Sequence, residues 1–208
     1  MTLLRECTIF LSSMSALPAI LIGWQRRHLF WWYCLVSFTA DAIQHPLDKD
    51  SIYSGIITNI FLLLEWLLIS TYLTRVLFPY RHNNIRSAAV IIIAAGFVGW
   101  VLYGGISNIS YLAADIFYSI YIGLLLVCLY RFMHNIEYQQ LDKSFHFLFC
   151  AVFLLFTSGS ITLFGIRNYL DANNPALSSN LWAIHNILNM IKNWVLAYCI
   201  YLIQKQEK

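Results

Sequence analysis

The sequence predicts an all-α, polytopic membrane protein in which residues 1–208 form a single domain of seven transmembrane helices. Hydrophobic residues make up 60% of the chain and charged residues only 11%, which is less than half the charged share of a typical soluble domain. Seven apolar stretches approach the length of about 20 residues that a helix needs to cross a bilayer. The lipid bilayer is therefore the expected environment of the whole chain.

The seven stretches are separated by short connections, of which 25–28, 46–50 and 104–110 are typical. Short connections predict that consecutive helices lie side by side and antiparallel. The second and fourth stretches are the shortest, and Pro46 lies just beyond the second. In chain order, the expected helices cover about 3–24, 29–45, 52–77, 87–103, 110–133, 145–166 and 180–203.

The basic residues give the expected orientation, because cytoplasmic loops of membrane proteins carry an excess of lysine and arginine. An arrangement of seven helices puts nine of the 13 basic residues on the side of the carboxyl terminus and three on the other, with Lys192 inside a helix. This predicts an outer amino terminus and a cytoplasmic carboxyl terminus in a plasma or inner membrane. The nine are Arg26, Arg27, Arg75, Arg81, Arg86, Arg131, Lys143, Lys205 and Lys208, and the three are Arg5, Lys49 and Arg167.

The cysteines and the known catalytic motifs argue against several classes of function. The five cysteines lie in or near apolar stretches without a CxxC pair, so we expect neither a disulfide framework nor a zinc site. No HExxH, GxSxG or P-loop motif occurs, which argues against an enzyme, and no metal site is expected. A net charge of only +3, with scattered basic residues, excludes an ordinary nucleic-acid-binding protein.

Polar side chains are concentrated in the last expected helix. His185, Asn186, Asn189, Lys192 and Asn193 follow one another at steps of one, three, three and one, which puts them in one stripe along a helix of 3.6 residues per turn. Such groups are costly in contact with lipid. This stripe is therefore expected to face other helices or an interior cavity, with the asparagines as hydrogen-bonding partners between helices.

Glu65, in the third expected helix, is the counterpart of Lys192. At a rise of 1.5 Å per residue, the two residues lie roughly 18–20 Å from the outer ends of their helices. A buried charge in a membrane costs at least about 2.5–3.5 kcal/mol, so such groups need partners. We therefore predict that Glu65 and Lys192 pair directly or through a short polar bridge. The pair is either functional or a structural contact that fixes helix packing.

A second polar layer is expected nearer to the outer end of the bundle. Asp41 follows Ser37 on one face of the second helix, and His185 and Asp115 lie at similar depth on the last and fifth helices. Hydroxyl groups from the first and sixth helices are expected to complete this layer. They belong to Ser12, Ser13, Ser15, Ser158, Ser160 and Thr162.

A lysine midway along the last of seven helices, together with Glu65-Trp66 in the third, resembles the microbial rhodopsins. The resemblance implies retinal bound to Lys192 as a Schiff base, with Glu65 as its counter-ion, in a photoreceptor or an ion pump. The sequence departs from that family at three places. Leu62 stands where an arginine is usual, Leu188 stands where a carboxylate is usual, and the sixth stretch lacks the Trp-x-x-Tyr-Pro motif. By architecture alone, the chain is also similar to the seven-helix sensor regions of bacterial histidine kinases.

These observations favour a seven-helix sensor or receptor-like protein. A small ligand would bind in an interior polar pocket and change the helix packing, which a cytoplasmic signalling partner would detect, or the chain would act as a homo-oligomer. The alternatives are the retinal protein, a proton-coupled transporter with Glu65 and Lys192 as its coupling pair, a membrane-embedded enzyme and a structural subunit. The expected pocket residues are Asp41, Glu65, Asp115, His185, Asn189, Lys192 and Asn193, and the expected contact charges for the partner are Arg81, Arg86, Arg131 and Lys143.

Overall fold

The computed structural model describes residues 2–24, 28–44, 52–77, 83–105, 111–134, 141–173 and 175–206. Within these ranges the chain forms eight α-helices, one short 3₁₀-helix and no strand, which confirms the expected all-α class. The elements are α1 (Thr2–Met14), α2 (Leu17–Gly23), α3 (Leu29–Gln44), α4 (Ile52–Leu77), α5 (Asn83–Gly104), α6 (Tyr111–His134), η1 (Leu141–Lys143), α7 (Phe145–Asn173) and α8 (Pro175–Gln206).

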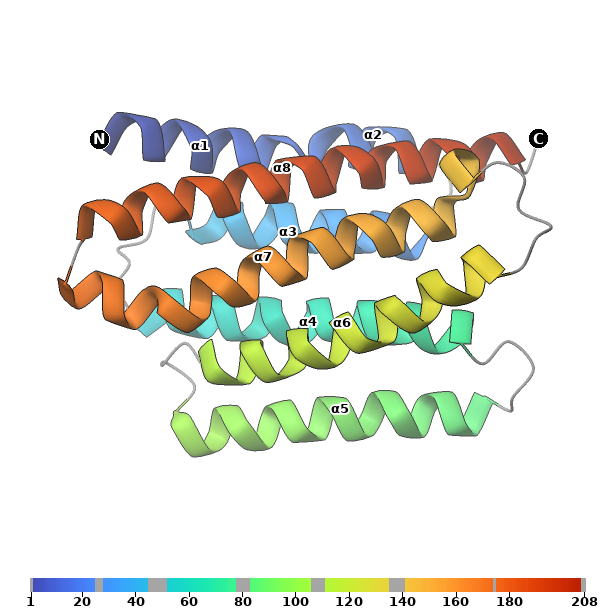
Figure 1. Cartoon of the computed structure of the whole chain (residues 1–208), viewed down its shortest axis with the longest axis horizontal. Helices are drawn as coiled ribbons and strands as arrows, with labels where there is room; N and C mark the ends of the chain where they lie inside the picture. The colour runs from blue at the N-terminus through green and yellow to red at the C-terminus, as the bar shows by residue number, and fades with distance from the viewer. Residues whose placement is uncertain are drawn as a thin grey trace.

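The helices run along one common direction and form an elongated bundle (Figure 1). We call the end at which α1 begins the N side, and the end at which α8 ends the C side. α1 and α2 follow one another from the N side to the C side, and the later long helices alternate in direction. α8 packs against α7, α1 and α2, while α5 lies at the edge of the bundle against α4. The two termini lie at opposite ends, as an odd number of passes requires.

The first expected helix is divided in two near Pro18. Proline has no backbone N–H, and its ring clashes with the carbonyl group four residues earlier, which here belongs to Met14. α1 accordingly ends at Met14, and α2 begins at Leu17 with the proline in its first turn. The two helices still make one apolar segment, Glu6–Gly23, that is long enough to cross a membrane.

Five helical segments of the described chain are long and apolar enough to span a membrane, as a membrane protein requires. They are Glu6–Gly23, Ile52–Leu77, Ala114–His134, Phe145–Leu163 and Leu181–Gln206. α3 has only 16 residues, and the apolar part of α5, Val90–Tyr103, is also short. These are the two stretches that were shortest in the sequence, so the count of seven spans and the orientation stay predictions.

The observed ends of the helices agree best with the ranges predicted from the sequence in the middle of the chain. α4 has the predicted limits, whereas α7 continues to Asn173 and α8 already begins at Pro175. The polar residues that follow the apolar part of α7 therefore continue the helix instead of ending it. Some expected features lie outside the described residues: the end of the second expected helix at residue 45, the loop 46–50, Arg26, Arg27, Arg81, Lys208, and the side chains of Arg5, Arg86 and Arg167.

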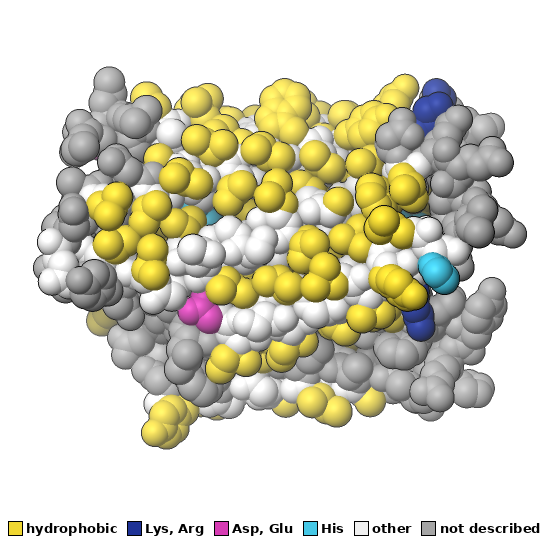
Figure 2. All heavy atoms as spheres, viewed as in Figure 1, with side chains coloured by type: hydrophobic (Ala, Val, Ile, Leu, Met, Phe, Trp, Pro, Cys, Tyr) yellow, Lys and Arg dark blue, Asp and Glu magenta, His cyan; other side chains and the backbone are white. Residues whose placement is uncertain are grey.

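Hydrophobic side chains cover most of the described surface in Figure 2. Leu21, Ile92 and Leu102 are 74%, 71% and 72% exposed, which suits contact with lipid and would be unfavourable in water. Exposed basic side chains occur at the C side, in the last turns of α4, α6 and α8 and in η1. They are Arg75, Arg131, Lys143 and Lys205.

Candidate functional site

Glu65 and Lys192 are joined through the phenol of Tyr33 in the interior of the bundle. Each of the two charged side chains is only 1% exposed. The Tyr33 hydroxyl donates a hydrogen bond to Glu65 Oε1 at 2.7 Å and accepts one from Lys192 Nζ at 2.6 Å. This geometry confirms the predicted pairing in its bridged form. We call Glu65, Tyr33 and Lys192 the charged bridge.

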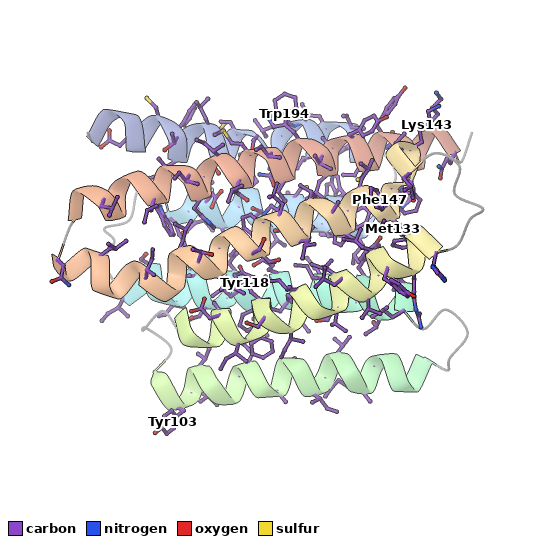
Figure 3. All side chains as sticks on the ribbon, in the orientation of Figure 1. Tyr103, Tyr118, Met133, Lys143, Phe147 and Trp194 are labelled. Atoms are coloured by element: carbon purple, nitrogen blue, oxygen red, sulfur yellow. The ribbon has the colours of Figure 1, made fainter. Side chains whose placement is uncertain are left out.

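Tyr118 supplies a second donor to the carboxylate of the bridge. Its hydroxyl lies 3.0 Å from Glu65 Oε2, so each carboxylate oxygen accepts a hydrogen bond from one phenol. Tyr118 lies in the first half of α6, near the centre of the view in Figure 3. Hydrogen bonds to a charged acceptor are stronger than those between neutral groups, above all in a medium of low dielectric. These contacts therefore tie α3, α4, α6 and α8 together at one point.

The ammonium group of Lys192 is enclosed by aromatic rings. Nζ lies 4.0 Å from the ring centroid of Phe156, 4.9 Å from that of Tyr33 and 5.8 Å from that of Phe153. The faces of aromatic rings attract a cation, and the attraction is greater when the cation is desolvated. These rings partly offset the free energy lost on burying the ammonium, and they occupy the space around it.

Three asparagines of α8 bind α1 through side-chain hydrogen bonds, and we call this set the asparagine ladder. The donors follow one face of α8, and the acceptors follow one face of α1 and the turn just beyond its end, where Ser15 lies, because each set repeats at steps of three or four residues. The predicted role of these asparagines as bonds between helices is confirmed. The pairs are Asn186 with Thr8 at 3.3 Å, Asn189 with Ser12 at 2.8 Å, and Asn193 with Ser15 at 2.9 Å.

Asp41, a member of the predicted outer layer, lies on the same helix as Tyr33 of the charged bridge. It lies half-buried near the end of α3, two helical turns from Tyr33 toward the N side. α1 packs against α3, and the hydroxyl of the buried Ser13 on α1 donates to the Ile9 carbonyl at 3.1 Å. Asp41 therefore shares a helix and a helix face with Tyr33 but lies two turns away from the charged bridge.

The neighbours of His185 and Asp115 differ from those of Asp41. His185 Nδ1 lies 3.3 Å from Ser160 Oγ, and the imidazole stacks on the Trp182 ring with 4.9 Å between the centroids. Asp115 lies beside Gly165 of α7, and its Oδ1 atom is buried without a hydrogen-bond partner in the described part of the chain. His185 therefore contacts α7 and its own helix, and Asp115 lies against α7.

The hydroxyl groups expected in the interior do not all lie there. Ser12, Ser15 and Ser160 do, through the contacts above. Ser158 and Thr162, in contrast, are exposed, and their hydroxyls donate to carbonyl groups of their own helix. Because a serine or threonine in a helix is able to bond to a carbonyl group four residues earlier, its presence alone does not indicate which face is buried.

Polar side chains line the interior on the N side of the charged bridge. Those on α3, α4, α7 and α8 lie one or two helical turns from Tyr33, Glu65, Phe156 or Lys192 in the direction of the N side. Those on α1 lie along the helix that bonds to Asn186 and Asn189 of α8. Seven of them are buried and three are half-buried. The buried ones are Thr8, Ser12, Ser13, Ser37, Asn59, Ser160 and Asn186, and the half-buried ones are Asp41, His185 and Asn189.

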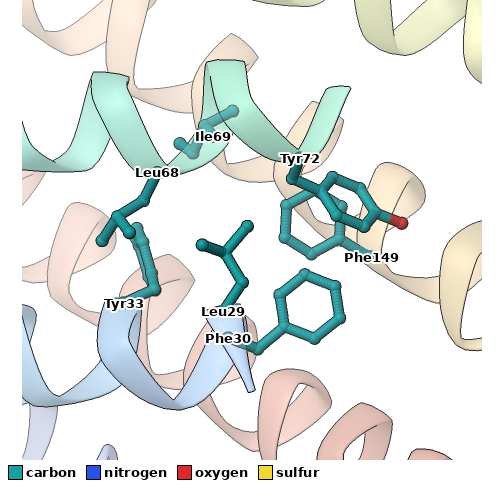
Figure 4. A pocket seen from close by; sticks show the side chains of 7 residues that line it. All are labelled: Leu29, Phe30, Tyr33, Leu68, Ile69, Tyr72 and Phe149. Carbon is teal, nitrogen blue, oxygen red and sulfur yellow. The ribbon is translucent and has the colours of Figure 1, made fainter. Parts of the chain in front are cut away.

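Aromatic and aliphatic side chains fill the interior on the C side of the bridge. Phe30 stacks on Phe149 with 4.7 Å between the ring centroids, and Tyr72 packs on both rings at 4.9 and 4.2 Å. Figure 4 shows these rings with Tyr33 around a small cavity of about 10 Å³, which is close to the minimum for one water. Because its lining offers a water no polar partners, this cavity is expected to stay dry.

The sequence did not identify Tyr33, Tyr118 or Phe156 as members of the site. A signal for Tyr33 was present, since it precedes Ser37 and Asp41 by four and eight residues on the same face of α3. No comparable signal marked Tyr118, because tyrosines also occur at exposed positions of α6 such as Tyr130. Only the packing of the helices shows which tyrosines are buried and which are exposed.

The bridge places a carboxylate and an ammonium on opposite sides of one phenol. A change in the charge of either group would therefore alter the hydrogen bonds of Tyr33 and the contact between α3, α4 and α8. No protein family, no curated protein and no solved structure matches this chain. Inference about function therefore depends on the geometry of the site.

Proposed function

We propose that the chain is a seven-helix membrane sensor or receptor-like protein, with α3 and α5 as spans in addition to the five long apolar segments. Its N side would face outward, as the distribution of lysine and arginine predicts. A stimulus would reach the charged bridge from the N side and change the packing of α3, α4, α6 and α8. A cytoplasmic partner would detect that change at the C side.

The observation that carries this proposal is the burial of opposite charges on different helices at the border of a polar and an apolar half. Removal of a single charge from such a pair leaves the other without compensation, which is strongly unfavourable in a low-dielectric interior. The free-energy difference between two arrangements of the helices, one with the bridge intact and one with it altered, would then depend on the charge of one group. That is the property of a two-state element.

The exposed cations of the C side are the proposed contact for the partner. Arg75, Lys143 and Lys205 extend from the ends of different elements and suit a partner with an acidic surface. Arg131 has a second task, since its guanidinium donates to the Leu77 carbonyl at 2.7 Å and so caps the end of α4. A movement of α6 relative to α4 would therefore reach this surface directly.

The two principal alternatives are less well supported by the geometry. A transporter needs access to its site from both sides in turn, and the rings of Phe30, Tyr72 and Phe149 fill the C side. A retinal protein needs space for a polyene beside Nζ of Lys192, and the ring of Phe156 occupies that space at 4.0 Å. The residues present around Lys192 therefore do not fit retinal.

Spin-label distances would test the proposal and separate it from a transporter. One pair of labels would report on the C side, at Met133 of α6 and Tyr201 of α8, and a second on the N side, at Phe10 of α1 and Tyr53 of α4, all exposed. Each pair would be measured in the parent and with Glu65→Gln. A sensor is expected to show a second distance population for the C-side pair after this change.

Two other outcomes would contradict the sensor. A shift of both pairs in opposite directions is the result expected of alternating access in a transporter. Unchanged distance distributions for both pairs would indicate a structural bridge without a switching role. Lys205→Gln, which removes an exposed charge from the end of α8, serves as the control and is expected to leave both distributions unchanged.

A further inference from the structure

The charged bridge contains a continuous path of hydrogen bonds from an acid to a base. Lys192 Nζ lies 2.6 Å from the Tyr33 hydroxyl oxygen, which in turn lies 2.7 Å from Glu65 Oε1. Both distances are short, as is typical of hydrogen bonds in which one partner is charged. Because the phenol accepts one of these bonds and donates the other, a hydrogen atom lies between each pair of neighbouring atoms along the path.

The side-chain nitrogen of Lys192 has surroundings that suit an amine as well as an ammonium. An ammonium has three hydrogens to donate. In the described part of the chain it donates to Tyr33 alone, and its other neighbours are aromatic rings such as that of Phe156, with the centroid at 4.0 Å. A neutral amine has one hydrogen fewer and a lone pair, which is able to accept a hydrogen bond from Tyr33.

The carboxyl group of Glu65 has partners in both of its charge states. Oε1 lies 2.7 Å from the Tyr33 hydroxyl, and Oε2 lies 3.0 Å from the Tyr118 hydroxyl. As a carboxylate, Glu65 accepts a hydrogen bond from each phenol. As an acid, it donates from Oε1 to the Tyr33 oxygen, while Oε2 still accepts from Tyr118. Neither charge state leaves a carboxyl oxygen without a hydrogen bond.

We propose that Tyr33 relays a proton from Lys192 to Glu65, so that the bridge has an ionic form and a neutral form. In this step the Tyr33 O–H bond breaks as its hydrogen moves to Glu65 Oε1. At the same time one N–H bond of Lys192 breaks, and its hydrogen forms a new O–H bond on Tyr33. No proton enters or leaves the bridge. The inference deepens the proposed function, on which its use as a signal rests, by giving the altered bridge a chemical form.

Burial brings the two forms of the bridge closer in free energy. In water the ionic form is strongly favoured, because a carboxylic acid is a far stronger acid than an ammonium. In a low-dielectric interior each ion loses its hydration, and the attraction between the two ions offsets that loss only in part. Glu65 and Lys192 are each 1% exposed, so both ions are subject to this loss. The neutral form avoids it and keeps the hydrogen bonds between α3, α4 and α8.

The polar half of the interior makes the balance between the two forms depend on water. Asn189 and Ser37 lie one helical turn from the bridge toward the N side, and their side chains are able to order water that stabilises the ions. The C side offers no such stabilisation, because the rings of Phe30, Tyr72 and Phe149 fill it. We therefore expect the ionic form in a fully hydrated membrane and a shift toward the neutral form when water is withdrawn.

Solid-state NMR of the full chain in lipid vesicles would test this inference, with one buffer pH and with samples at high and at low hydration. The nitrogen shift of a lysine side chain separates ammonium from amine, and the carbon shift of a carboxyl group separates carboxylate from acid. From high to low hydration, Lys192 is expected to move toward the amine and Glu65 toward the acid, in equal proportion. Lys205, an exposed lysine of the same helix, is the internal control and is expected to stay an ammonium.

Two variants test the relay itself. Tyr33→Phe removes the relaying hydroxyl and keeps the ring, so Lys192 and Glu65 are expected to stay ionic at both hydrations. Tyr118→Phe removes a phenol from the same carboxyl group without interrupting the path, and it is expected to keep the transfer. If Tyr33→Phe does not assemble, the comparison of hydrations in the parent and in Tyr118→Phe still tests the inference.

Three results would overturn the inference. They are an ammonium signal of Lys192 at both hydrations in the parent, an amine at Lys192 while Glu65 stays a carboxylate, and a transfer that persists in Tyr33→Phe. The C-side spin-label distances separate this inference from the proposed function. Transfer in the parent without a second distance population in Glu65→Gln would keep the relay and contradict the sensor. A second distance population without transfer in the parent would keep the sensor and contradict the relay.

Discussion

The two halves of the bundle differ in the side chains that fill their interiors. On the N side, side chains of different helices bond to one another, as in the asparagine ladder between α8 and α1. On the C side, stacked rings fill most of the space. The polar groups among them form few bonds between helices, which are those of Ser70 with Tyr121 and of Tyr72 with His146. The charged bridge lies at the border between these halves.

This difference indicates which half has a structural task and which half is able to respond. A packed apolar interior has few alternative arrangements with similar free energy, so the C side is expected to move as a unit. A polar interior exchanges hydrogen bonds with water at little loss. Events on the N side would therefore reach the bridge, and the C side would transmit the resulting movement.

The largest effect is expected from Lys192→Met, which removes one charge at the border of the two halves. Glu65 would remain buried with its phenol donors and without a cation, so the free energy of unfolding is expected to fall by about 3–5 kcal/mol. Denaturant titration of the protein in detergent measures this change. The double change Glu65→Gln with Lys192→Met is expected to recover most of the loss, because no unpaired charge remains.

Lys205→Met is the matched control, since it removes an exposed lysine from the same helix. Equal stability of Lys192→Met and Lys205→Met would show that the bridge does not stabilise the bundle.

Gly23→Ala tests the close packing of the C side. A Cβ atom at Gly23 would lie 2.6 Å from Trp31 Cδ1, and the Trp31 ring is held by a hydrogen bond to the Ile20 carbonyl at 2.9 Å. Overpacking of this kind is expected to lower the free energy of unfolding by about 1–3 kcal/mol. At Gly99, where nothing lies within 4 Å, the same substitution is expected to have no such effect. Similar stabilities of the two variants would contradict the tight packing of α2 against α3.

Tyr72→Phe tests a hydrogen bond in the apolar half. The Tyr72 hydroxyl lies 2.6 Å from His146 Nδ1, in a part-buried hydrogen bond between α4 and α7. The free energy of unfolding is expected to fall by about 0.5–1.5 kcal/mol, with the packing of the ring unchanged. Tyr130→Phe, at an exposed tyrosine of α6, is the control. A loss no greater than that of the control would indicate that the C side is not dry at this point.

Asn189→Leu is expected to have the smallest effect, because it removes one hydrogen bond of the ladder on the N side. The bond to Ser12 measures 2.8 Å, and bonds between membrane helices are worth about 0.6 kcal/mol on average. The same titration would measure the loss against Ile191→Leu, a change at an exposed neighbour. A loss of unfolding free energy larger than that of Tyr72→Phe would contradict the expectation that a hydrogen bond stabilises the bundle less on the N side than on the C side.

The sequence was sufficient for those features that depend on composition and helical period. The apolar stretches predicted the helices, and the depths of Glu65 and Lys192 predicted their pairing. The sequence was not sufficient for features that depend on how helices rotate against one another. Tyr33 became the bridging group, and Ser158 became an exposed residue, because tertiary packing decides which face of each helix is buried.

The central claim is that the charged bridge is reached from the N side and closed on the C side. Labelling of cysteines introduced one at a time, with a membrane-impermeant thiol reagent, tests it directly at Asn189 and at Leu196, which lie on opposite sides of Lys192 on α8. The parent would be Cys7→Ser, because Cys7 is exposed and the other four cysteines are buried. We expect Asn189→Cys to react only from the N side and Leu196→Cys to react from neither. A reaction of Leu196→Cys from the C side, or none at Asn189→Cys from the N side, would contradict the account.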